Sequence, residues 1–555
     1  MSQFDETFDF IVVGCGAGSM PAAMVMRDAG KSVVVLEKSD SVGGTTAKSG
    51  GVMWIPNNPF MARDGVQDSY EQAEQYLNSL IAGHENVPGS TPERRAAYLK
   101  HSPELVHFLL AHGVKLTRVP YWPDYYDDLP GGCEPGRTVV AELFDTKQLG
   151  ARRKQLQRGF LPLPLMLGDA LRLGYLGKEW SVRWAVVKFV GRLIAQLFTG
   201  KRRVSAGAAL QGWMIKAGLD HGVELRTDAA VSQLLVDSGR VTGVEVVIDG
   251  QPRRLGASLG VLVNAGGFAH SAELRAQYLP ATQASWTNTI PSDTGDLIPQ
   301  LGELGAQFAN MDTLLGYQSA VPPGHENDYV KPGMQKTTVA PHCILVDQSG
   351  VRYMNEGGSY VAYCRNMLER NKTVPAVPSW AVMDHQGFKS VGVTGKKSLR
   401  QVKPWLESGF LKMADSLADL AIQMDCDPDV LQATVARFNG FARQGKDEDF
   451  NRGGRAYDRW LGNKYNPSGA NFGELSQGPF FAFPVIPGDV STYGGAVTDE
   501  HARVLNQDGN PIPGLYATGT SAASVFGHFY PGAGASIGPS ATFGYLAARH
   551  AVANS

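Results

Sequence analysis

A glycine-rich segment close to the N-terminus has the residue types and spacing that bind a dinucleotide. Residues 14–19 read GCGAGS, directly after an apolar run and directly before a helical stretch. Gly14 permits a tight turn, Gly16 lets the backbone approach a pyrophosphate, and the helix start offers N–H donors and a positive dipole. Ser19 stands where the usual pattern has a third glycine. The segment predicts a bound nucleotide cofactor.

Two features that follow this turn point to FAD. The apolar run at 32–37 ends in Glu37, whose carboxylate can accept hydrogen bonds from ribose hydroxyls. Residues 43–51 (GGTTAKSGG) come soon after it, and their backbone N–H groups and small hydroxyls can hold a second stretch of phosphate and ribityl. A flavin dinucleotide needs such an additional clamp, so the sequence predicts FAD.

The elements that carry these motifs predict a parallel sheet completed by the C-terminal part of the chain. Residues 260–267 and 514–519 read as buried strands that end in glycines. A late strand that returns to an early βαβ unit makes the nucleotide domain discontinuous. We therefore predict an α/β fold (α+β overall), with a Rossmann-type FAD-binding domain at 1–279 and 486–555. A catalytic cap domain at 280–485 is inserted, and the substrate is expected in the cleft between the two.

Residues 534–538 (GASIG) have the G-x-S-x-G pattern of a hydrolase nucleophile. That triad needs an acid and then a histidine downstream, and no acidic residue follows Ser536. We interpret the segment as a helix start whose amides, at Ser536 and Ile537, face the pyrimidine edge of a flavin.

Composition excludes several classes of function. The 555 residues carry a net charge of −2 and are 43% hydrophobic, which argues against a disordered chain and a globally basic nucleic-acid-binding protein. The five cysteines are far apart, so we expect a reducing compartment and neither a disulfide framework nor a metal site. The N-terminus has no apolar signal region and no apolar run is long enough to span a bilayer, which predicts a cytoplasmic protein.

Positive charge is concentrated in an insertion at about 140–205. Residues 151–203 hold twelve Lys and Arg and two acidic residues, and 180–198 has helical periodicity with mostly apolar side chains. One interpretation is a core helix beside a solvated basic loop. The other is a helix that lies on an anionic membrane with its tryptophans at the interface. The second interpretation predicts peripheral association with the inner face of the cytoplasmic membrane through 159–203.

Five local motifs together resemble the 3-ketosteroid Δ1-dehydrogenases, which belong to the succinate dehydrogenase/fumarate reductase flavoprotein group. The motifs are the N-terminal turn, GGT at 43–45, DTGD at 293–296, YATG at 516–519 and FYPGAG at 529–534. The resemblance covers nearly the whole chain except parts of the insertion. It implies FAD as cofactor and a 3-ketosteroid as substrate, and we expect a quinone or another electron acceptor.

The resemblance also implies roles for four residues. The Tyr530 hydroxyl and the Gly534 amide hold the C3 carbonyl, Tyr360 takes a proton from C2, and Tyr125 supports Tyr360. In this 1,2-desaturation a hydride passes from C1 to flavin N5. Because an unperturbed tyrosine has a pKa of about 10, we expect Tyr125 to lower the pKa of Tyr360.

Three alternatives stay open. The first is a 3-ketosteroid 4,5-desaturase, which the glycines at 532 and 534 disfavour. The second is a fumarate-reductase-like flavoprotein that acts on another enone or carboxylate. It needs arginines that clamp carboxylates, and Arg352, Arg365 and Arg370 lie in the central region. The third is a flavin-binding protein of the membrane surface without turnover of its own.

The predicted site therefore consists of a catalytic set and an FAD-binding set. The catalytic set is Tyr125, Tyr360, Tyr530 and Gly534. The FAD-binding set is Gly14, Gly16, Ala17, Gly18, Ser19, Glu37, Lys38, Gly43, Gly44, Thr45, Thr46, Ser49, Gly50, Gly51, Ala265, Gly266, Gly519, Ser536 and Ile537.

Overall fold

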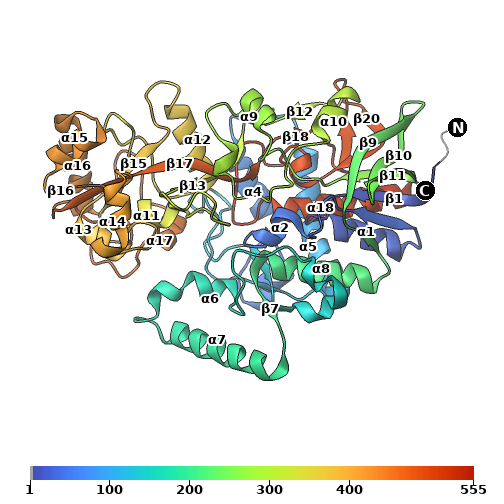
Figure 1. The fold of residues 1–555 in the computed structure, drawn as a ribbon, viewed down its shortest axis with the longest axis horizontal. Coiled ribbons are helices and arrows are strands. Elements are labelled where there is room, and N and C mark those ends of the chain that lie inside the picture. The colour runs from blue at the N-terminus through green and yellow to red at the C-terminus, as the bar shows by residue number, and fades with distance from the viewer. Residues whose placement is uncertain (1–3) are drawn as a thin grey trace.

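The computed structural model describes residues 4–555 and has two lobes side by side (Figure 1). A twisted sheet forms the core of the first, which we call the nucleotide lobe. Its strands, in spatial order, are β19 (Arg503–Leu505), β20 (Pro511–Ala517), β11 (Gln251–Val263), β1 (Glu6–Val13), β2 (Val33–Leu36) and β8 (Glu224–Arg226). All neighbours in this order pair in parallel except β19 and β20. The β2 strand reads VVVL and is buried throughout, as expected for a parallel strand covered on both faces.

Helices cover this sheet, and a hairpin extends it. The helices are α1 (Ser19–Asp28), α5 (Pro92–Ala111), α8 (Ala206–Asp220) and α18 (Ile537–Ala553); α18 packs against both α1 and α5. The hairpin of β9 (Ala229–Asp237) and β10 (Arg240–Ile248) is antiparallel to the first half of β11. The predicted fold class is confirmed, because the N-terminal βαβ unit and the C-terminal β20 belong to one sheet.

The second lobe, which we call the cap lobe, is built on an antiparallel sheet. Its strands are β13 (Leu314–Ser319), β14 (Cys343–Val346), β15 (Ser379–Met383), β16 (Lys412–Ala414) and β17 (Phe480–Thr492). Its helices are α11 (Gln335–Thr338), α12 (Tyr360–Arg370), α13 (His385–Ser390), α14 (Leu399–Glu407), α15 (Leu417–Met424), α16 (Pro428–Gln444) and α17 (Ala456–Leu461). The domain boundary that we predicted at 485 falls inside β17, whose pairing with β13 continues to Thr492. The division into domains stays a prediction.

Three smaller sheets complete the fold. One has the strand order β3-β5-β4, and the other two are pairs, β12 with β18 and β6 with β7. The remaining bounds are α2 (Gly44–Lys48), β3 (Val52–Trp54), α3 (Pro59–Arg63), α4 (Tyr70–Ile81), β4 (Leu116–Arg118), β5 (Thr138–Ala141), β6 (Phe144–Asp145), β7 (Arg203–Val204), α9 (Ala272–Tyr278), α10 (Ile298–Glu303), β12 (Phe308–Ala309) and β18 (Gly495–Ala496).

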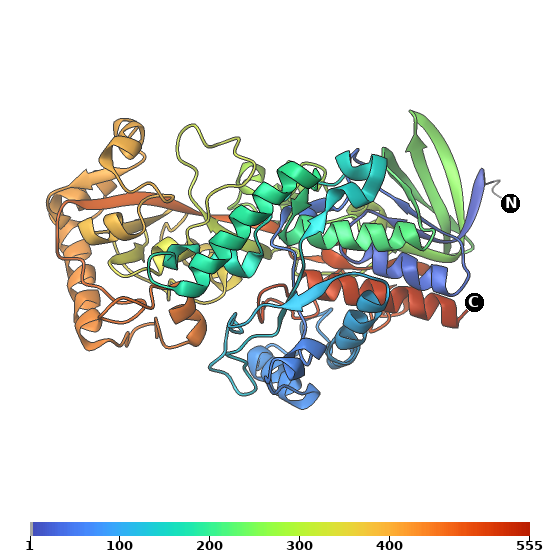
Figure 2. The same ribbon diagram turned by 90° about the horizontal axis from the view of Figure 1, so that it is seen from below.

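The basic insertion carries two helices on one side of the molecule. They are α6 (Leu167–Leu171) and α7 (Trp180–Thr199), and Figure 2, the view from below, shows α7 crossing the junction between the lobes. Only two side chains of α7 are buried, at Val182 and Ala185. The interpretation of this segment as a core helix is therefore wrong. Along residues 4–555, no helix combines the length and the apolar character needed to cross a membrane.

Candidate active site

The parallel strands bring four chain segments to one edge of the sheet. Gly14, Glu37, Asn264 and Thr518 each come directly after a strand, and these strands are neighbours. This edge opens into a cavity of about 530 Å³. Since ligands of open α/β sheets bind at the carboxyl ends of the strands, this is the expected place for a nucleotide.

The glycine turn above β1 has a shape that only glycine can adopt. Gly14 has a φ of +91°, and a Cβ there would stand 2.2 Å from the carbonyl oxygen of Asn264. A Cβ on Gly18 would stand 2.4 Å from the carbonyl oxygen of Ser540. The Ser19 hydroxyl donates to the Gly14 carbonyl at 2.7 Å and so closes the turn. The result is a cradle of bare backbone that suits a pyrophosphate.

Most of the predicted FAD-binding residues line this cavity. Those on its wall are Gly14, Gly16, Ala17, Glu37, Lys38, Gly44, Thr45, Thr46, Ser49, Gly50, Gly51, Ala265, Gly266, Gly519, Ser536 and Ile537. Gly18, Ser19 and Gly43 are not on the wall: the first two lie beneath the turn, and Gly43, with a φ of +103°, precedes the short helix α2. The residues present therefore fit an extended dinucleotide, and these three help to shape its site.

Glu37 and Lys38 differ in how they face this site. Glu37 is buried and accepts the Cys15 N–H at 3.0 Å, and burial raises the pKa of its carboxyl group. The carboxylate thus ties the end of β2 to the glycine turn and still faces the cavity. Lys38 also lines the cavity, but its ammonium group forms an ion pair with Asp296 at 2.6 Å.

The sequence did not lead us to two polar residues in the part of the cavity that suits the dinucleotide. The side-chain amide of Asn264 lies 2.8 Å from the Ser19 hydroxyl. Asp293 accepts the Gly267 N–H at 2.6 Å, and burial raises the pKa of its carboxyl group to about 7. Both line the cavity. The signal was present, because Asn264 precedes the predicted Ala265 and Asp293 opens the DTGD motif.

The three predicted catalytic tyrosines lie together in the other part of the cavity. The ring centroids of Tyr360 and Tyr530 are 5.3 Å apart, and that of Tyr125 lies 5.6 Å and 5.8 Å from them. All three line the cavity, together with Gly534. At least 170 residues separate any two of these side chains along the chain, and both lobes contribute to the cluster.

Tyr530 and Gly534 lie close together on the cavity wall. The Tyr530 hydroxyl lies 3.2 Å from the Ser536 hydroxyl. Burial raises the pKa of Tyr530, although hydrogen bonds from Ser536 and Tyr360 and from the Gly534 N–H oppose this rise. Gly534 has a φ of +96°, and a Cβ there would stand 2.3 Å from the carbonyl oxygen of Val52. Only glycine fits this position of the cavity wall without strain.

Tyr125 is held by the turn that contains it. The Asp124 carboxylate accepts the Trp54 indole N–H at 2.7 Å and a guanidinium N–H of Arg137 at 2.5 Å. The Tyr125 N–H donates to the Pro531 carbonyl at 2.9 Å, next to Tyr530 in the chain. The two tyrosines are thus fixed to each other through backbone and a buried ion pair.

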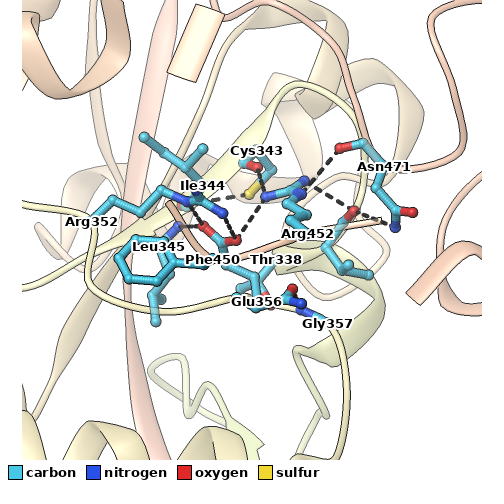
Figure 3. A network of polar contacts seen from close by, with 12 residues as sticks. Thr338, Cys343, Ile344, Leu345, Arg352, Glu356, Gly357, Phe450, Arg452 and Asn471 are labelled. Atoms are coloured by element: carbon cyan, nitrogen blue, oxygen red, sulfur yellow. Dashed lines mark hydrogen bonds and ion pairs between the residues drawn. The ribbon is translucent and has the colours of Figure 1, made fainter. Parts of the chain in front are cut away.

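Tyr360 begins α12, directly after a loop held by a buried ionic network (Figure 3). Glu356 of this loop accepts two hydrogen bonds from Arg352, both at 2.8 Å, and lies 3.1 Å from Arg452. Burial alone would raise the pKa of Glu356, but the two arginines hold it below its usual range. A charged, paired glutamate thus anchors the loop that presents Tyr360 to the cavity.

The comparisons with known proteins agree with this geometry. The family model described as FAD binding domain matches residues 9–537. The chain is 38% identical to the 3-oxosteroid 1-dehydrogenase of Mycobacterium tuberculosis (strain ATCC 25618 / H37Rv) over 98% of each chain. The chain belongs to the 3-oxosteroid 1-dehydrogenase family. The predicted family and the predicted cofactor class are confirmed.

Other members of the 3-oxosteroid 1-dehydrogenase family are similar over the same length. The protein of that name from Mycolicibacterium smegmatis is 37% identical, over 98% of this chain and 97% of its own. The crystal structure of the 3-ketosteroid delta1-dehydrogenase from Sterolibacterium denitrificans, in complex with 1,4-androstadiene-3,17-dione, has a TM-score of 0.89 at 34% identity. It covers 99% of this chain and 100% of the other. A 3-ketosteroid-delta4-(5alpha)-dehydrogenase from Rhodococcus jostii RHA1 shares the fold, with a TM-score of 0.68 at 19% identity over 100% of this chain and 98% of its own.

The pKa of Tyr360 in this chain is higher than the sequence led us to expect. Burial raises it well above the usual value, Tyr530 raises it further, and only the hydrogen bond from Tyr125 lowers it. The hydrogen bond from Tyr125 therefore lowers the pKa of Tyr360, as expected, but by less than burial raises it. The position of Tyr360 at the first residue of α12 adds a positive helix end, which favours the phenolate.

Two further tyrosines of this family member extend the cluster. The ring centroid of Tyr457 lies 4.2 Å from that of Tyr125, and the ring of Tyr317 lies 5.9 Å from that of Tyr360. Both line the cavity. Sequence reasoning missed them because neither belongs to a motif with fixed spacing.

The three central arginines do not form the clamp that the fumarate-reductase-like alternative needs. Arg352 pairs with Glu356 and Asp447, and Arg370 pairs with Asp347. Arg365 lies over the Phe529 ring. None of the three lines the cavity. The dicarboxylate alternative therefore has no support in the placement of these residues.

Proposed function

We propose that this chain is an FAD-dependent 3-oxosteroid 1-dehydrogenase that introduces the C1–C2 double bond of a 3-ketosteroid. One observation carries this most directly. Tyr530 and Gly534 lie close together on the wall of the cavity that the dinucleotide cradle shares, and the Tyr530 ring is 5.3 Å from that of Tyr360. We propose further that 1–279 and 486–555 bind FAD, and that 280–485 covers the substrate.

The residues of this cluster can divide the work of one desaturation. FAD, when bound, supplies the acceptor for the hydride that leaves C1. Tyr530 and Gly534 donate hydrogen bonds to the C3 carbonyl oxygen and stabilise the negative charge that develops there, which acidifies the C2 proton. Tyr360 as phenolate takes that proton, and Tyr125 donates to the Tyr360 oxygen and stabilises this form. The buried rings around them exclude water from the reacting carbons.

An anaerobic titration tests this function. The FAD-loaded protein is mixed with 4-androstene-3,17-dione, the flavin absorbance is followed, and the double bond of the product is assigned by NMR. Bleaching with a product double bond at C1–C2 supports the proposal. A double bond elsewhere, or bleaching by fumarate-type dicarboxylates and not by the steroid, contradicts it.

We also propose that the protein docks on an anionic membrane through α7. Many outward side chains of this helix are large and apolar: Trp180 is 74% exposed, Leu197 82% and Phe198 86%. The basic Arg183 and Lys188 are exposed among them. The polar Arg192 and Gln196 are turned toward the protein, where Gln196 accepts the Arg203 N–H at 2.8 Å. An amphipathic helix with its apolar face in water, flanked by basic residues, is typical of binding to the surface of a bilayer.

Replacing Trp184, Leu197 and Phe198 together by glutamine should release the protein from vesicles that contain anionic phospholipid. Each side chain contributes about 1.5 kcal/mol or more when it leaves water, so we expect at least about tenfold weaker binding. Co-sedimentation measures this, and turnover of dispersed steroid should be unchanged. Ile422→Gln, which changes an exposed residue of α15, is the matched control. Equal binding of the triple variant and the original protein contradicts the proposal.

Point substitutions in α7 test membrane binding more specifically than a deletion of the segment 159–200 would. Phe160, Leu167 and Leu171 of that segment line the cavity, so the deletion would also open the steroid site. A membrane position also suits an acceptor of quinone type, which takes up two electrons and two protons and dissolves in the bilayer. We propose this class of acceptor because the apolar face and the cavity wall belong to one insertion.

A further inference from the structure

Lys336 is a cation of the cavity wall that has no partner of opposite charge. It belongs to α11, and its side chain lines the cavity. The nearest acceptor to its Nζ is the carbonyl oxygen of Leu171, at 3.5 Å. Along residues 4–555, no carboxylate lies within 4.0 Å of this Nζ. The mechanism described above uses no cation at this place.

The surroundings of Lys336 are aromatic and aliphatic. Its Nζ lies 5.5 Å from the centroid of the Trp460 ring, and Trp460 stacks on Trp122 at 5.3 Å. Leu167 and Leu171 of the insertion complete this part of the wall. More than a third of Lys336 is exposed to solvent, so its ammonium group stands where the cavity meets water, and the buried part of its surroundings lowers its pKa.

A series of flat rings connects the reacting end of the cavity to Lys336. The Tyr125 ring lies 4.2 Å from that of Tyr457, and Tyr457 stacks on Trp460 at 5.7 Å with an interplanar angle of 17°. The wall thus runs from the hydroxyl cluster to the ammonium group without an intervening charge. It suits a flat apolar ligand with a carbonyl at one end and a group that meets Lys336 at the other.

The chemistry of lysine determines which group that is. The Lys336 ammonium group keeps part of its water and has no protein carboxylate beside it, so it is free to pair with an anionic group of a ligand in the cavity. A neutral ketone needs only a hydrogen-bond donor, which a hydroxyl or amide supplies without a charge. A carboxylate at the D-ring end of a steroid would instead pair with Lys336.

Resting on the function proposed above, we infer that Lys336 is a specificity residue that selects 3-ketosteroids whose D-ring side chain ends in a carboxylate. The C3 carbonyl then lies at Tyr530 and Gly534, and the flat ring system follows the aromatic wall. The side chain ends between α11, α17 and the insertion helix α6. The reaction at C1 and C2 is the same for acidic and neutral substrates, so the effect is expected in KM.

A matched pair of substrates tests this inference: 3-oxo-4-cholenoic acid and its methyl ester, with the FAD-loaded protein. We expect the original protein to have the lower KM for the acid. Lys336→Met should raise the KM for the acid by about fivefold, because an ion pair with a partly exposed ammonium group is lost. The KM for the ester should change less than about twofold, with kcat retained for both. Lys336→Arg should keep the preference for the acid.

Lys331→Met serves as the control, because Lys331 is in the same segment but does not line the cavity. Flavin content and circular dichroism confirm that each variant is folded. Equal KM values of the original protein for acid and ester, or an equal effect of Lys336→Met on both, overturn the inference. Turnover of the ester and of 4-androstene-3,17-dione shows at the same time whether the proposed function holds. If neither steroid is oxidised, the proposed function fails; if both are and only the preference is absent, only this inference fails.

Discussion

Tyr360→Phe keeps its flavin and loses nearly all steroid oxidation, by about 10²- to 10⁴-fold, the usual contribution of a positioned base. The ring continues to pack against Tyr125 and Tyr530, so the cavity keeps its shape. What the variant lacks is the oxygen that accepts the C2 proton. Stopped-flow measurement of flavin reduction under anaerobic conditions gives the rate. Tyr363→Phe is the matched control, since it removes a hydroxyl from the same helix outside the cavity wall.

The same residue sets the expected pH dependence. Because burial holds the pKa of Tyr360 above its usual value, the phenolate is the minor form at neutral pH, and its fraction rises with pH. The rate of flavin reduction should therefore climb from neutral into alkaline solution. Tyr125→Phe removes the hydrogen bond that lowers this pKa and should move the rise to higher pH. A flat profile between pH 7 and pH 9, or a Tyr360→Phe variant within about tenfold of the original rate, would rule out Tyr360 as the base.

Tyr530→Phe should cost about 10²- to 10³-fold in kcat, because one of two donors to the developing charge is removed. The Gly534 N–H still binds the carbonyl oxygen, so the KM should change less than kcat. The exchange of the C2 proton with deuterated solvent should slow as well, since that proton is acidic only while the carbonyl is held.

The neighbouring Tyr493 provides the control for this prediction. Its ring lies 6.2 Å from that of Tyr530, but its hydroxyl donates to the Phe529 carbonyl at 2.6 Å. Tyr493→Phe should therefore reduce activity far less than Tyr530→Phe. Equal losses in the two variants would mean that the packing of this loop, and not the Tyr530 hydroxyl, is what matters.

The cofactor half of the site could be predicted well because its signals are local. The glycine turn, Glu37 and the cluster at 43–51 lie within one βαβ unit and the segment that follows it, where spacing along the chain largely determines position in space. The turn at Gly14 illustrates this, since its φ of +91° is a property of a few adjacent residues. Asn264 and Asp293 were missed because they approach the turn from distant segments.

The steroid half depended on the resemblance to a family. Composition and periodicity give no reason to single out Tyr125, Tyr360 and Tyr530 among 19 tyrosines. Only the structure shows that Tyr457 and Tyr317 lie in the same cluster. It also shows that the domain boundary predicted at 485 falls within β17. The twist and pairing of a long strand decide where one lobe ends, and these depend on its neighbours in space.

The sequence by itself determined the nucleotide fold, the FAD class and the presence of a basic, apolar insertion. Each rests on local spacing, or on composition summed over a segment. Only the tertiary structure decided that the apolar face of α7 points into water, that Arg352 is neutralised inside the cap lobe, and that Tyr360 has a raised pKa. It also decided that Lys336 faces the cavity without a carboxylate. The physical reason is the same for all four: burial, charge pairing and loss of water depend on residues that are distant in the chain and adjacent in the fold.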